Sequence, residues 1–436
     1  MVFGLYWKAK KITGKGDLMM KETRFKDTEI GRIPEDWEMI SLGDVGNVQM
    51  CKRIMKYQTS EKGEIPFYKI GTFGKQADSF ISSKLFEDFK AKYNYPKKGD
   101  ILLSAAGTIG RTVIFDGCPS YFQDSNIVWI DNNEQVLSNS MLYYIYKNLK
   151  WVTESETIPR IYNSIVSSII FPIPLNKHEQ KRIASALTSI DNLISSLDKL
   201  IEKKKNIKQG TMQQLLTGKK RLKGFTEPWV ETLLGEGLVF QCGAPFQSSY
   251  FNEKHLGLRL IKNRDLKSDD QVYYYNGAYT EDYVVHNGDL LIGMDGDFLP
   301  CIWTKGDALL NQRVGRIISE DWNLRYLYYT LREPLFMKQE GTGATTVKHL
   351  SHSDIESMRV FMTTDNNEQS AIASVLISMD NEISSLEAKR AKYETIKQGM
   401  MQQLLTGKIR LTDAQYRAKE YSAPINNNDY SFAAEP

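Results

Sequence analysis

The sequence has few of the residues that bind metals or form disulfides. Among its 436 residues there are four cysteines and five histidines. No two cysteines form a CxxC pair and no histidines form an HExxH pattern, so we expect no structural zinc, and the chain fits a reducing cytosol. The cysteines lie far apart, at Cys51, Cys118, Cys242 and Cys301.

The chain also lacks an apolar run long enough to cross a bilayer, which takes about 20 residues. Its first residues include Phe3, Tyr6 and Trp7 but no signal-peptide core of adequate length. We therefore expect a cytoplasmic protein.

A strong excess of charge of one sign is missing as well. The net charge is +3, with 41% hydrophobic and 25% charged residues, which is ordinary for a globular protein. The overall balance does not indicate a nucleic-acid binder, so any nucleic-acid footprint must come from local patches.

An internal repeat decides the organisation of the chain. Residues 178–222 and 367–411 align without gaps at an offset of 189, from His178 to Asn367. Roughly 28 of about 45 positions match, far more than chance allows in a repeat of this length. Upstream the repeat persists more faintly, since Trp37 answers Trp229 and residues 98–103 answer 287–292. The unit is a variable domain followed by a near-identical segment, and it occurs twice.

The near-identical segments carry apolar residues at alternating steps of four and three, which is the heptad stripe of a coiled coil. Each segment predicts a helix of about 40 residues, and Gly218 and Gly407 resemble stop signals just beyond the helix ends. Two such stripes would pair as an antiparallel coiled coil with pseudo-twofold symmetry; the alternative is two ordinary core helices, which are usually shorter. The predicted seam residues are Ile183, Leu187, Ile190, Ile194, Leu197 and Ile201 in the first copy and Ile372, Leu376, Met379, Ile383 and Leu386 in the second.

The variable segments mix short apolar runs with Gly, Asn, Asp and Ser turns, which predicts mixed α+β domains. We expect helices at 141–148 and 324–331. The predicted strands are 101–104, 112–115, 126–130, 290–292, 301–303 and 314–318. We divide the chain into an N-terminal extension (1–20), a first variable domain (21–175), a first helical region (176–222), a second variable domain (223–364), a second helical region (365–411) and a disordered polar tail (412–436).

The order of these motifs resembles the specificity subunits of type I restriction–modification enzymes. The resemblance runs from about Lys21 to Leu411 and rests on Ile33–Trp37, Ser41–Asp44, Pro172–Ile183 and Gln213–Lys219, together with their duplication. It implies a bacterial or archaeal DNA-specificity chain without catalysis of its own. Each recognition domain would read one half of a bipartite double-stranded DNA target, and the helices would set the spacing.

The resemblance also implies partners and their cofactors. Two methyltransferase subunits would use S-adenosylmethionine, and restriction/motor subunits would use ATP and Mg, whereas this chain would bind none of them. The repeated Thr-Gly-Lys triplets lack the spacing and the Ser/Thr of a phosphate loop. There is also no Asn/Asp-Pro-Pro-Tyr/Phe element of the kind adenine methyltransferases carry. Two rival hypotheses are a pseudo-symmetric coiled-coil adaptor that does not read DNA and a stand-alone enzyme.

Candidate DNA contacts in the first domain are polar or basic side chains in loops, which suit base edges and phosphates. Alternatives are a solvated loop at 52–57 and a tight hairpin at 104–111, where Arg111 could bind guanine. Arg160 and Tyr162 lie in a family-like segment before the first helix. The candidates are Lys52, Arg53, Lys56, Tyr57, Lys69, Thr72, Lys75, Thr108, Arg111, Gln123, Asn126, Arg160 and Tyr162.

The second domain differs in charge. Its first loop lacks the cations of Lys52 and Arg53, and its glycine turn, Asp295-Gly-Asp297, is acidic. A carboxylate can accept a hydrogen bond from cytosine but repels phosphate. The candidates are Gln247, Tyr250, Lys262, Arg264, Asn311, Gln312, Arg313, Thr345, Thr346, Lys348 and His349. The lysines of the first helix could face spacer phosphates or form a solvated face; they are Lys199, Lys203, Lys204, Lys205 and Lys208.

Overall fold

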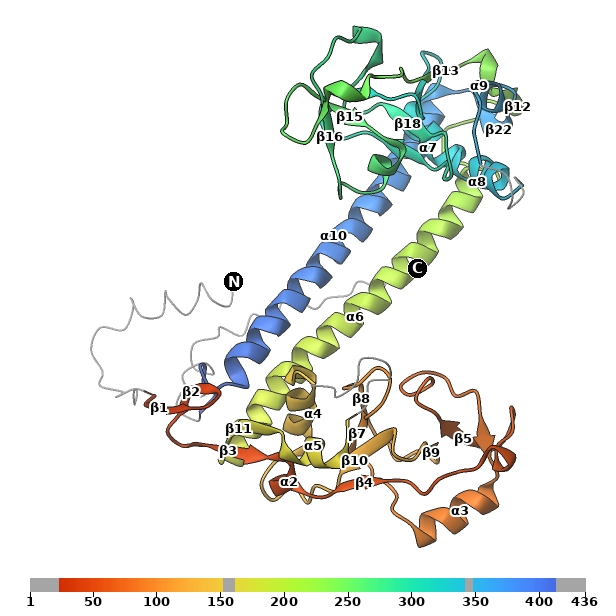
Figure 1. Cartoon of the computed structure of the whole chain (residues 1–436). Coiled ribbons are helices and arrows are strands. Elements are labelled where there is room, and N and C mark those ends of the chain that lie inside the picture. The colour runs from red at the N-terminus through yellow and green to blue at the C-terminus, as the bar shows by residue number, and fades with distance from the viewer. Residues whose placement is uncertain (1–22, 152–160, 342–347, 413–436) are drawn as a thin grey trace. The chain divides into compact units, whose positions relative to one another are not determined.

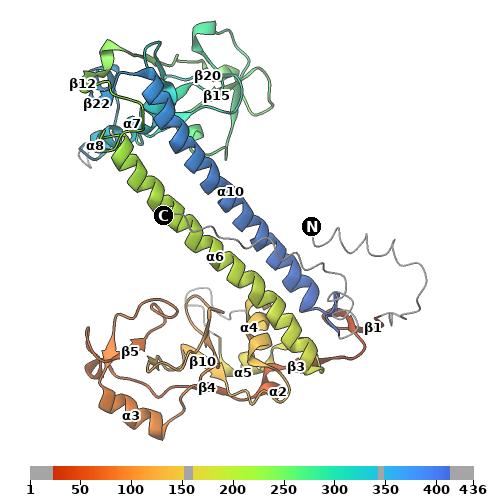
Figure 2. The ribbon, with the colours of Figure 1, turned by 180° about the vertical axis from the view of Figure 1, so that it is seen from behind.

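The computed structural model describes residues 23–151, 161–341 and 348–412, which fall into two compact units. The first unit comprises Met1–Ser196 and Ala391–Pro436, and the second comprises Leu197–Arg390. Each unit contains one recognition domain and a part of each of two long helices (Figures 1 and 2). No helix within the described residues is long and apolar enough to cross a membrane.

The two long helices are α6 (Lys177–Leu215) and α10 (Asn366–Leu404), each of 39 residues. Neither contains proline, and the chain leaves each helix through a glycine in the left-handed region, Gly218 at φ +66° and Gly407 at φ +69°. Such a glycine ends a helix without the steric cost that a side chain would meet there. The predicted helices and their stop signals are confirmed.

The first recognition domain is built on an antiparallel sheet in the order β4-β10-β7-β8. A smaller sheet, β6-β5-β9, contains the parallel pair β5 and β9. Strand β3 pairs with β11, which leads into α6. The elements are β1 (Phe25–Thr28), β2 (Gly31–Pro34), β3 (Trp37–Ser41), α2 (Leu42–Val45), β4 (Val48–Met50), η1 (Lys56–Gln58), β5 (Ile65–Tyr68), β6 (Phe80–Ile81), α3 (Ser83–Lys92), β7 (Ile101–Ser104), β8 (Thr112–Ile114), β9 (Tyr121–Phe122), β10 (Ile127–Ile130), α4 (Asn139–Asn148), α5 (Asn163–Ser168) and β11 (Ile170–Pro174).

The second recognition domain repeats this plan with a larger second sheet. Its antiparallel sheet runs β13-β21-β18-β19, and its second sheet runs β14-β16-β15-β20-β17 with the parallel pair β15 and β20. The elements are β12 (Trp229–Leu233), η2 (Leu234–Glu236), β13 (Val239–Cys242), η3 (Ser248–Tyr250), β14 (Phe251–Asn252), β15 (Leu258–Ile261), η4 (Asn263–Leu266), β16 (Tyr273–Tyr275), η5 (Glu281–Tyr283), β17 (Val284–Val285), β18 (Leu290–Gly293), β19 (Pro300–Ile302), β20 (Ala308–Leu310), β21 (Val314–Ile318), α7 (Leu324–Thr330), α8 (Arg332–Gly341), α9 (His352–Glu356) and β22 (Arg359–Thr363).

The mixed α+β class is confirmed, and the predicted strands agree with β7, β8, β10, β18, β19 and β21 to within one or two residues. The predicted helices correspond to α4 and α7. Helices α3 and α8 were not predicted from the sequence, because each is short and its apolar positions are few.

Within each unit the parts of α6 and α10 run antiparallel, because residue numbers of bonded partners change in opposite directions. In the second unit Asp198 pairs with Arg390 and Lys208 with Asp380. In the first unit Asp191 pairs with Lys397 at 2.6 Å. The seam residues Ile183, Leu187, Ile372 and Leu376 are buried, as are Ile190, Ile194, Leu197, Ile201 and Ile383, whereas Met379 and Leu386 are half-buried.

These pairs correct the interpretation of the helix lysines. Lys204 pairs with Glu382 and Lys205 with Glu387, each at 2.7 Å, and Lys208 pairs with Asp380. The three ammonium groups are held by carboxylates of α10, so they neither form a purely solvated face nor stand free for phosphates.

A tyrosine joins each recognition domain to this helix pair. The Tyr144 hydroxyl of α4 donates to Asp191 at 2.9 Å, and the Tyr329 hydroxyl of α7 donates to Asp380 at 2.6 Å. Burial raises the pKa of both phenols, so they stay protonated as donors. Asp191 and Asp380 are repeat equivalents, and each also binds a lysine of the other helix. The same Tyr–Asp–Lys arrangement therefore fastens both recognition domains.

Replacing Tyr329 with phenylalanine should lower the free energy of unfolding of the second unit by about 1.5 kcal/mol, the lower range for a hydrogen bond to a charged group. Urea denaturation measures the change. Tyr57→Phe is the control, because Tyr57 is 84% exposed and its loss should change stability by less than about 0.5 kcal/mol. Equal effects of the two variants would show that the hydroxyl does not fasten the domain.

The first turn of each long helix carries a buried Glu-Gln pair. Gln180 accepts from the Ser138 amide at 2.9 Å and donates to the Pro174 carbonyl, and Gln369 makes the equivalent bonds to Asn323 and Thr363. These bonds hold the start of each helix against its recognition domain. The Glu-Gln pair shared by the two copies therefore has a structural role.

The glutamates of these pairs bind the arginine that follows the opposite long helix. Arg410 makes two hydrogen bonds to Glu179, at 2.6 and 2.7 Å, and Arg221 makes two to Glu368, at 2.9 and 2.6 Å. Arg410 also donates to Asp36, and these bonds hold the pKa of Asp36 below its ordinary value. We call these two arrangements the helix-end ion pairs.

Candidate nucleic-acid interface

Five of the first-domain candidates line one cleft of about 1060 Å³. The cleft is formed by loops that follow β4, β5 and β9. Because β5 and β9 are parallel, the loops at their carboxyl ends are neighbours, and the Gln123 amide donates to the Tyr68 carbonyl at 2.9 Å. The candidates in its lining are Arg53, Lys56, Lys69, Gln123 and Asn126.

Hydrogen bonds within the cleft distinguish scaffold groups from available groups. The Gln123 side-chain oxygen accepts from the Ile70 amide at 2.9 Å, Arg53 donates to Asp124 at 2.8 Å, and Lys69 pairs with Asp78 at 2.8 Å. The Arg53 side chain is nevertheless 66% exposed, and Lys56 is exposed. The cleft therefore offers cations and an amide NH₂ group around a rigid rim, a combination suited to phosphates and base edges.

Arg111 does not line this cleft, and its guanidinium is already hydrogen-bonded within the domain. Its guanidinium donates to the Phe73 carbonyl at 2.8 Å, and the residue is half-buried. Residues 104–111 form the tight hairpin between β7 and β8, with Gly107 and Gly110 at positive φ. Arg111 thus braces the loop that contains Phe73, and the hairpin alternative describes this segment.

The remaining first-domain candidates are scattered. The Lys52 ammonium lies 5.2 Å from the Tyr93 ring, the Thr72 hydroxyl bonds to the Lys69 backbone, and Tyr57, Lys75, Thr108 and Tyr162 are exposed. Arg160 lies outside the described residues.

In the second domain the carboxylates of the acidic turn bind basic side chains from other segments. The Asp295 carboxylate binds Arg313 and His349, and Asp297 pairs with Lys267. Burial raises the pKa of Asp295, but the hydrogen bonds from His349 and Arg313 outweigh it and hold the pKa below its ordinary value. The turn's negative charge is thus balanced inside the domain, which the sequence pattern did not reveal.

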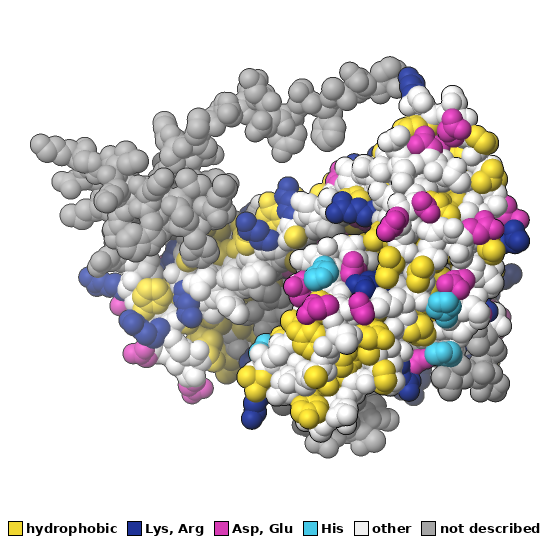
Figure 3. All heavy atoms as spheres, turned by 90° about the horizontal axis from the view of Figure 1, so that it is seen from above, with side chains coloured by type: hydrophobic (Ala, Val, Ile, Leu, Met, Phe, Trp, Pro, Cys, Tyr) yellow, Lys and Arg dark blue, Asp and Glu magenta, His cyan; other side chains and the backbone are white. Residues whose placement is uncertain are grey.

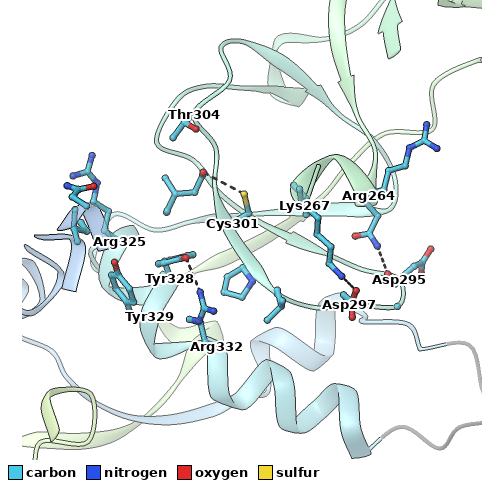
Figure 4. A pocket seen from close by; sticks show the side chains of 18 residues that line it. Arg264, Lys267, Asp295, Asp297, Cys301, Thr304, Arg325, Tyr328, Tyr329 and Arg332 are labelled. Atoms are coloured by element: carbon cyan, nitrogen blue, oxygen red, sulfur yellow. Dashed lines mark hydrogen bonds and ion pairs between the residues drawn. The ribbon is translucent and has the colours of Figure 1, made fainter. Parts of the chain in front are cut away.

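A cleft of about 840 Å³ opens beside this turn, between η4, β19, α7 and α10 (Figure 4). In Figure 4 the Lys267 side chain points to Asp297, and Arg332 lies against Tyr328, to whose hydroxyl it donates at 2.9 Å. Of the second-domain candidates that the structure describes, only Arg264 lines this cleft.

The other second-domain candidates make separate side-chain contacts or are exposed. The Lys262 ammonium lies 3.3 Å from the Tyr273 ring centre, Asn311 caps the Gln312 amide, and Lys348 pairs with Glu340 at 3.6 Å. Gln247, Tyr250 and Gln312 are exposed, whereas Thr345 and Thr346 lie outside the described residues.

Within residues 23–151, 161–341 and 348–412, no three His, Cys, Asp or Glu side chains are placed to hold a metal ion. On the face shown in Figure 3, Lys and Arg side chains are interspersed with Asp and Glu. That face therefore presents charges of both signs.

Residues 34–209 and 244–398 each match the model of the type I restriction modification DNA specificity domain. The chain belongs to this family. A putative type I restriction enzyme specificity subunit of Haemophilus influenzae is 54% identical over 181 residues, which cover 41% of this chain and 47% of that protein. The type I restriction enzyme MjaVIII specificity subunit of Methanocaldococcus jannaschii is 27% identical over 431 residues, covering 91% of this chain and 98% of that protein.

The fold of this type I specificity chain is also similar to that of a solved relative. The crystal structure of the type I restriction–modification S subunit from M. genitalium superimposes with a TM-score of 0.58, covering 85% of this chain and 96% of that one, at 14% identity. The fold described above is therefore similar to that of a type I restriction–modification S subunit.

Proposed function

We propose that this chain directs a type I restriction–modification complex to one interrupted DNA sequence, each recognition domain binding one half. The observation that carries the proposal is the repeated domain plan with unlike reading surfaces. The first domain presents the cleft lined by Arg53, Lys56 and Lys69. The second presents Arg313 and His349, which are bound to Asp295 of the acidic turn. Two unlike surfaces predict two unlike half-sites.

In this proposal the chain contributes recognition and no catalysis. The α6–α10 helices set the separation of the half-sites and dock the partner subunits. Two methyltransferase subunits bind S-adenosylmethionine, and restriction subunits bind ATP and Mg. The family match supports the recognition role, and the two 39-residue helices provide a frame for it.

The test is to sequence the methylome of a host that expresses this chain with its methyltransferase subunit. We expect adenine methylation at one interrupted motif with two different halves. A host that expresses the methyltransferase subunit alone is the control and should lack the motif. An uninterrupted motif, or no methylation, would contradict the proposal.

Lys56→Gln should weaken binding of the assembled complex to all DNA sequences alike and reduce the slope of log affinity against log salt by about one. Lys56 lines the cleft and is exposed, so it suits a phosphate contact. Lys84→Gln is the matched control, because Lys84 is exposed on α3 and does not line the cleft. A binding curve of the unsubstituted complex that does not respond to salt would favour the adaptor hypothesis instead.

A further inference from the structure

Each oxygen of the Asp295 carboxylate accepts a hydrogen bond from a side chain of another segment. Its Oδ1 is 2.8 Å from His349 Nδ1, and its Oδ2 accepts from Arg313 Nη1. The Asp295 side chain is 19% exposed, whereas those of Arg313 and His349 are 65% and 57% exposed. The acid is thus covered, and the two side chains it binds face solvent.

Backbone bonds hold the three segments together at this point. Met294 donates to the Arg313 carbonyl at 3.0 Å, and Leu350 donates to the Met294 carbonyl at 2.7 Å. Asp295 and His349 form an isolated β-bridge, and the Asn263 side chain donates to the Asp295 carbonyl. Because several backbone and side-chain bonds hold the backbone at Asp295, its carboxylate can fix the orientation of the Arg313 and His349 side chains.

The chemistry of the bonds determines what the exposed groups can offer. An ionised carboxylate only accepts, so His349 Nδ1 is the donor in this bond, and an imidazole whose single proton is on Nδ1 presents Nε2 as an acceptor. Arg313 uses Nη1 on Asp295 and keeps Nε and Nη2 as donors. Together they offer an arginine edge with donors and an imidazole acceptor. In the major groove a G·C pair presents acceptors on guanine and an amino donor on cytosine, which is the complementary pattern.

We propose that Asp295 is a positioning residue that orients Arg313 and His349 toward a G·C base pair of the second half-site, without contacting the base itself. This proposal rests on the proposed function. A carboxylate in this turn was a candidate acceptor for cytosine, but each of the Asp295 oxygens already accepts a hydrogen bond from a side chain of the domain. The repeat-equivalent position in the first domain is Ala106, so the effect belongs to one half-site only.

The test uses the complex of this chain with its methyltransferase subunits and DNA in which the first half-site is fixed and the second is varied one base pair at a time. Asp295→Asn keeps the shape of the side chain but cannot accept from both partners. We expect it to lose discrimination at one G·C position, by on the order of 5- to 150-fold, the range for one base-pair contact. Discrimination in the first half-site should not change.

Two further variants separate positioning from direct contact and from general damage. Asp297→Asn removes a carboxylate of the same turn that binds Lys267 and neither Arg313 nor His349, and it should leave discrimination intact. In an Arg313→Gln/His349→Gln background, adding Asp295→Asn should cause no further loss, because a positioning residue acts only through its partners.

Each outcome decides a different question. A further loss in the double-variant background would mean that Asp295 contacts the base, and an effect of Asp295→Asn no larger than that of Asp297→Asn would also overturn the proposal. If the unsubstituted complex showed no preference at any position of the second half, the proposed function itself would fail.

Discussion

Replacing Arg410 with methionine should destabilise the first unit by about 3–5 kcal/mol, because it leaves a buried carboxylate without a counter-ion. The Glu179 side chain is 1% exposed, and Arg410 supplies both of its guanidinium hydrogen bonds. Asp36, the other partner, is 66% exposed and can return to water at little cost. Urea titration followed by hydrogen exchange, which reports each unit separately, measures the loss.

Arg359→Gln is the control for removing an arginine from an ion pair. Arg359 and Glu231 are 3.5 Å apart with side chains 60% and 67% exposed, and such pairs contribute at most about 1 kcal/mol. A double variant, Arg410→Met with Glu179→Leu, should recover much of the loss, because no buried charge remains. If Arg410→Met cost no more than Arg359→Gln, the buried pair would not stabilise the unit.

Exchanging the first recognition domain, residues 21–174, for that of another specificity chain should change one half of the methylated motif and leave the other half and the spacing unaltered. The structure adds a condition for a folded product. The incoming domain must supply the tyrosine that binds Asp191 and a backbone amide for Gln180, as Tyr144 and Ser138 do here.

Methylome sequencing of the host reads the outcome of the exchange directly. The reciprocal exchange of residues 223–364 is the matched control and should change the other half. A change in both halves after either exchange would contradict independent reading, and with it the assignment of one half-site to each domain.

The sequence alone predicted the elements whose periodicity is local. The heptad stripes, Gly218 and Gly407 predicted α6 and α10, and short apolar runs predicted the central strands of both domains. The duplication predicted that the two domains share one fold, because the repeat continues more faintly upstream of each near-identical helical segment.

The hydrogen-bond and ion-pair partners of individual side chains could not be predicted from such local patterns. Arg111, a candidate for binding guanine, donates instead to the Phe73 carbonyl, and three of the five helix lysines bind carboxylates of α10. The partners of Asp295 lie 18 and 54 residues away in the sequence. A single sequence shows which groups are charged, whereas the fold decides which charges meet.

The helix-end ion pairs have a consequence for synthesis on the ribosome. The second unit is one continuous segment of the chain, Leu197–Arg390. The first unit includes Ala391 onward, and Glu179 obtains its partner only when Arg410 has emerged. Domains generally fold as units while the chain is made. The first recognition domain is therefore translated first but obtains its last stabilising contact at the end of synthesis. Until Arg410 is available, the Glu179 carboxylate has no counter-ion.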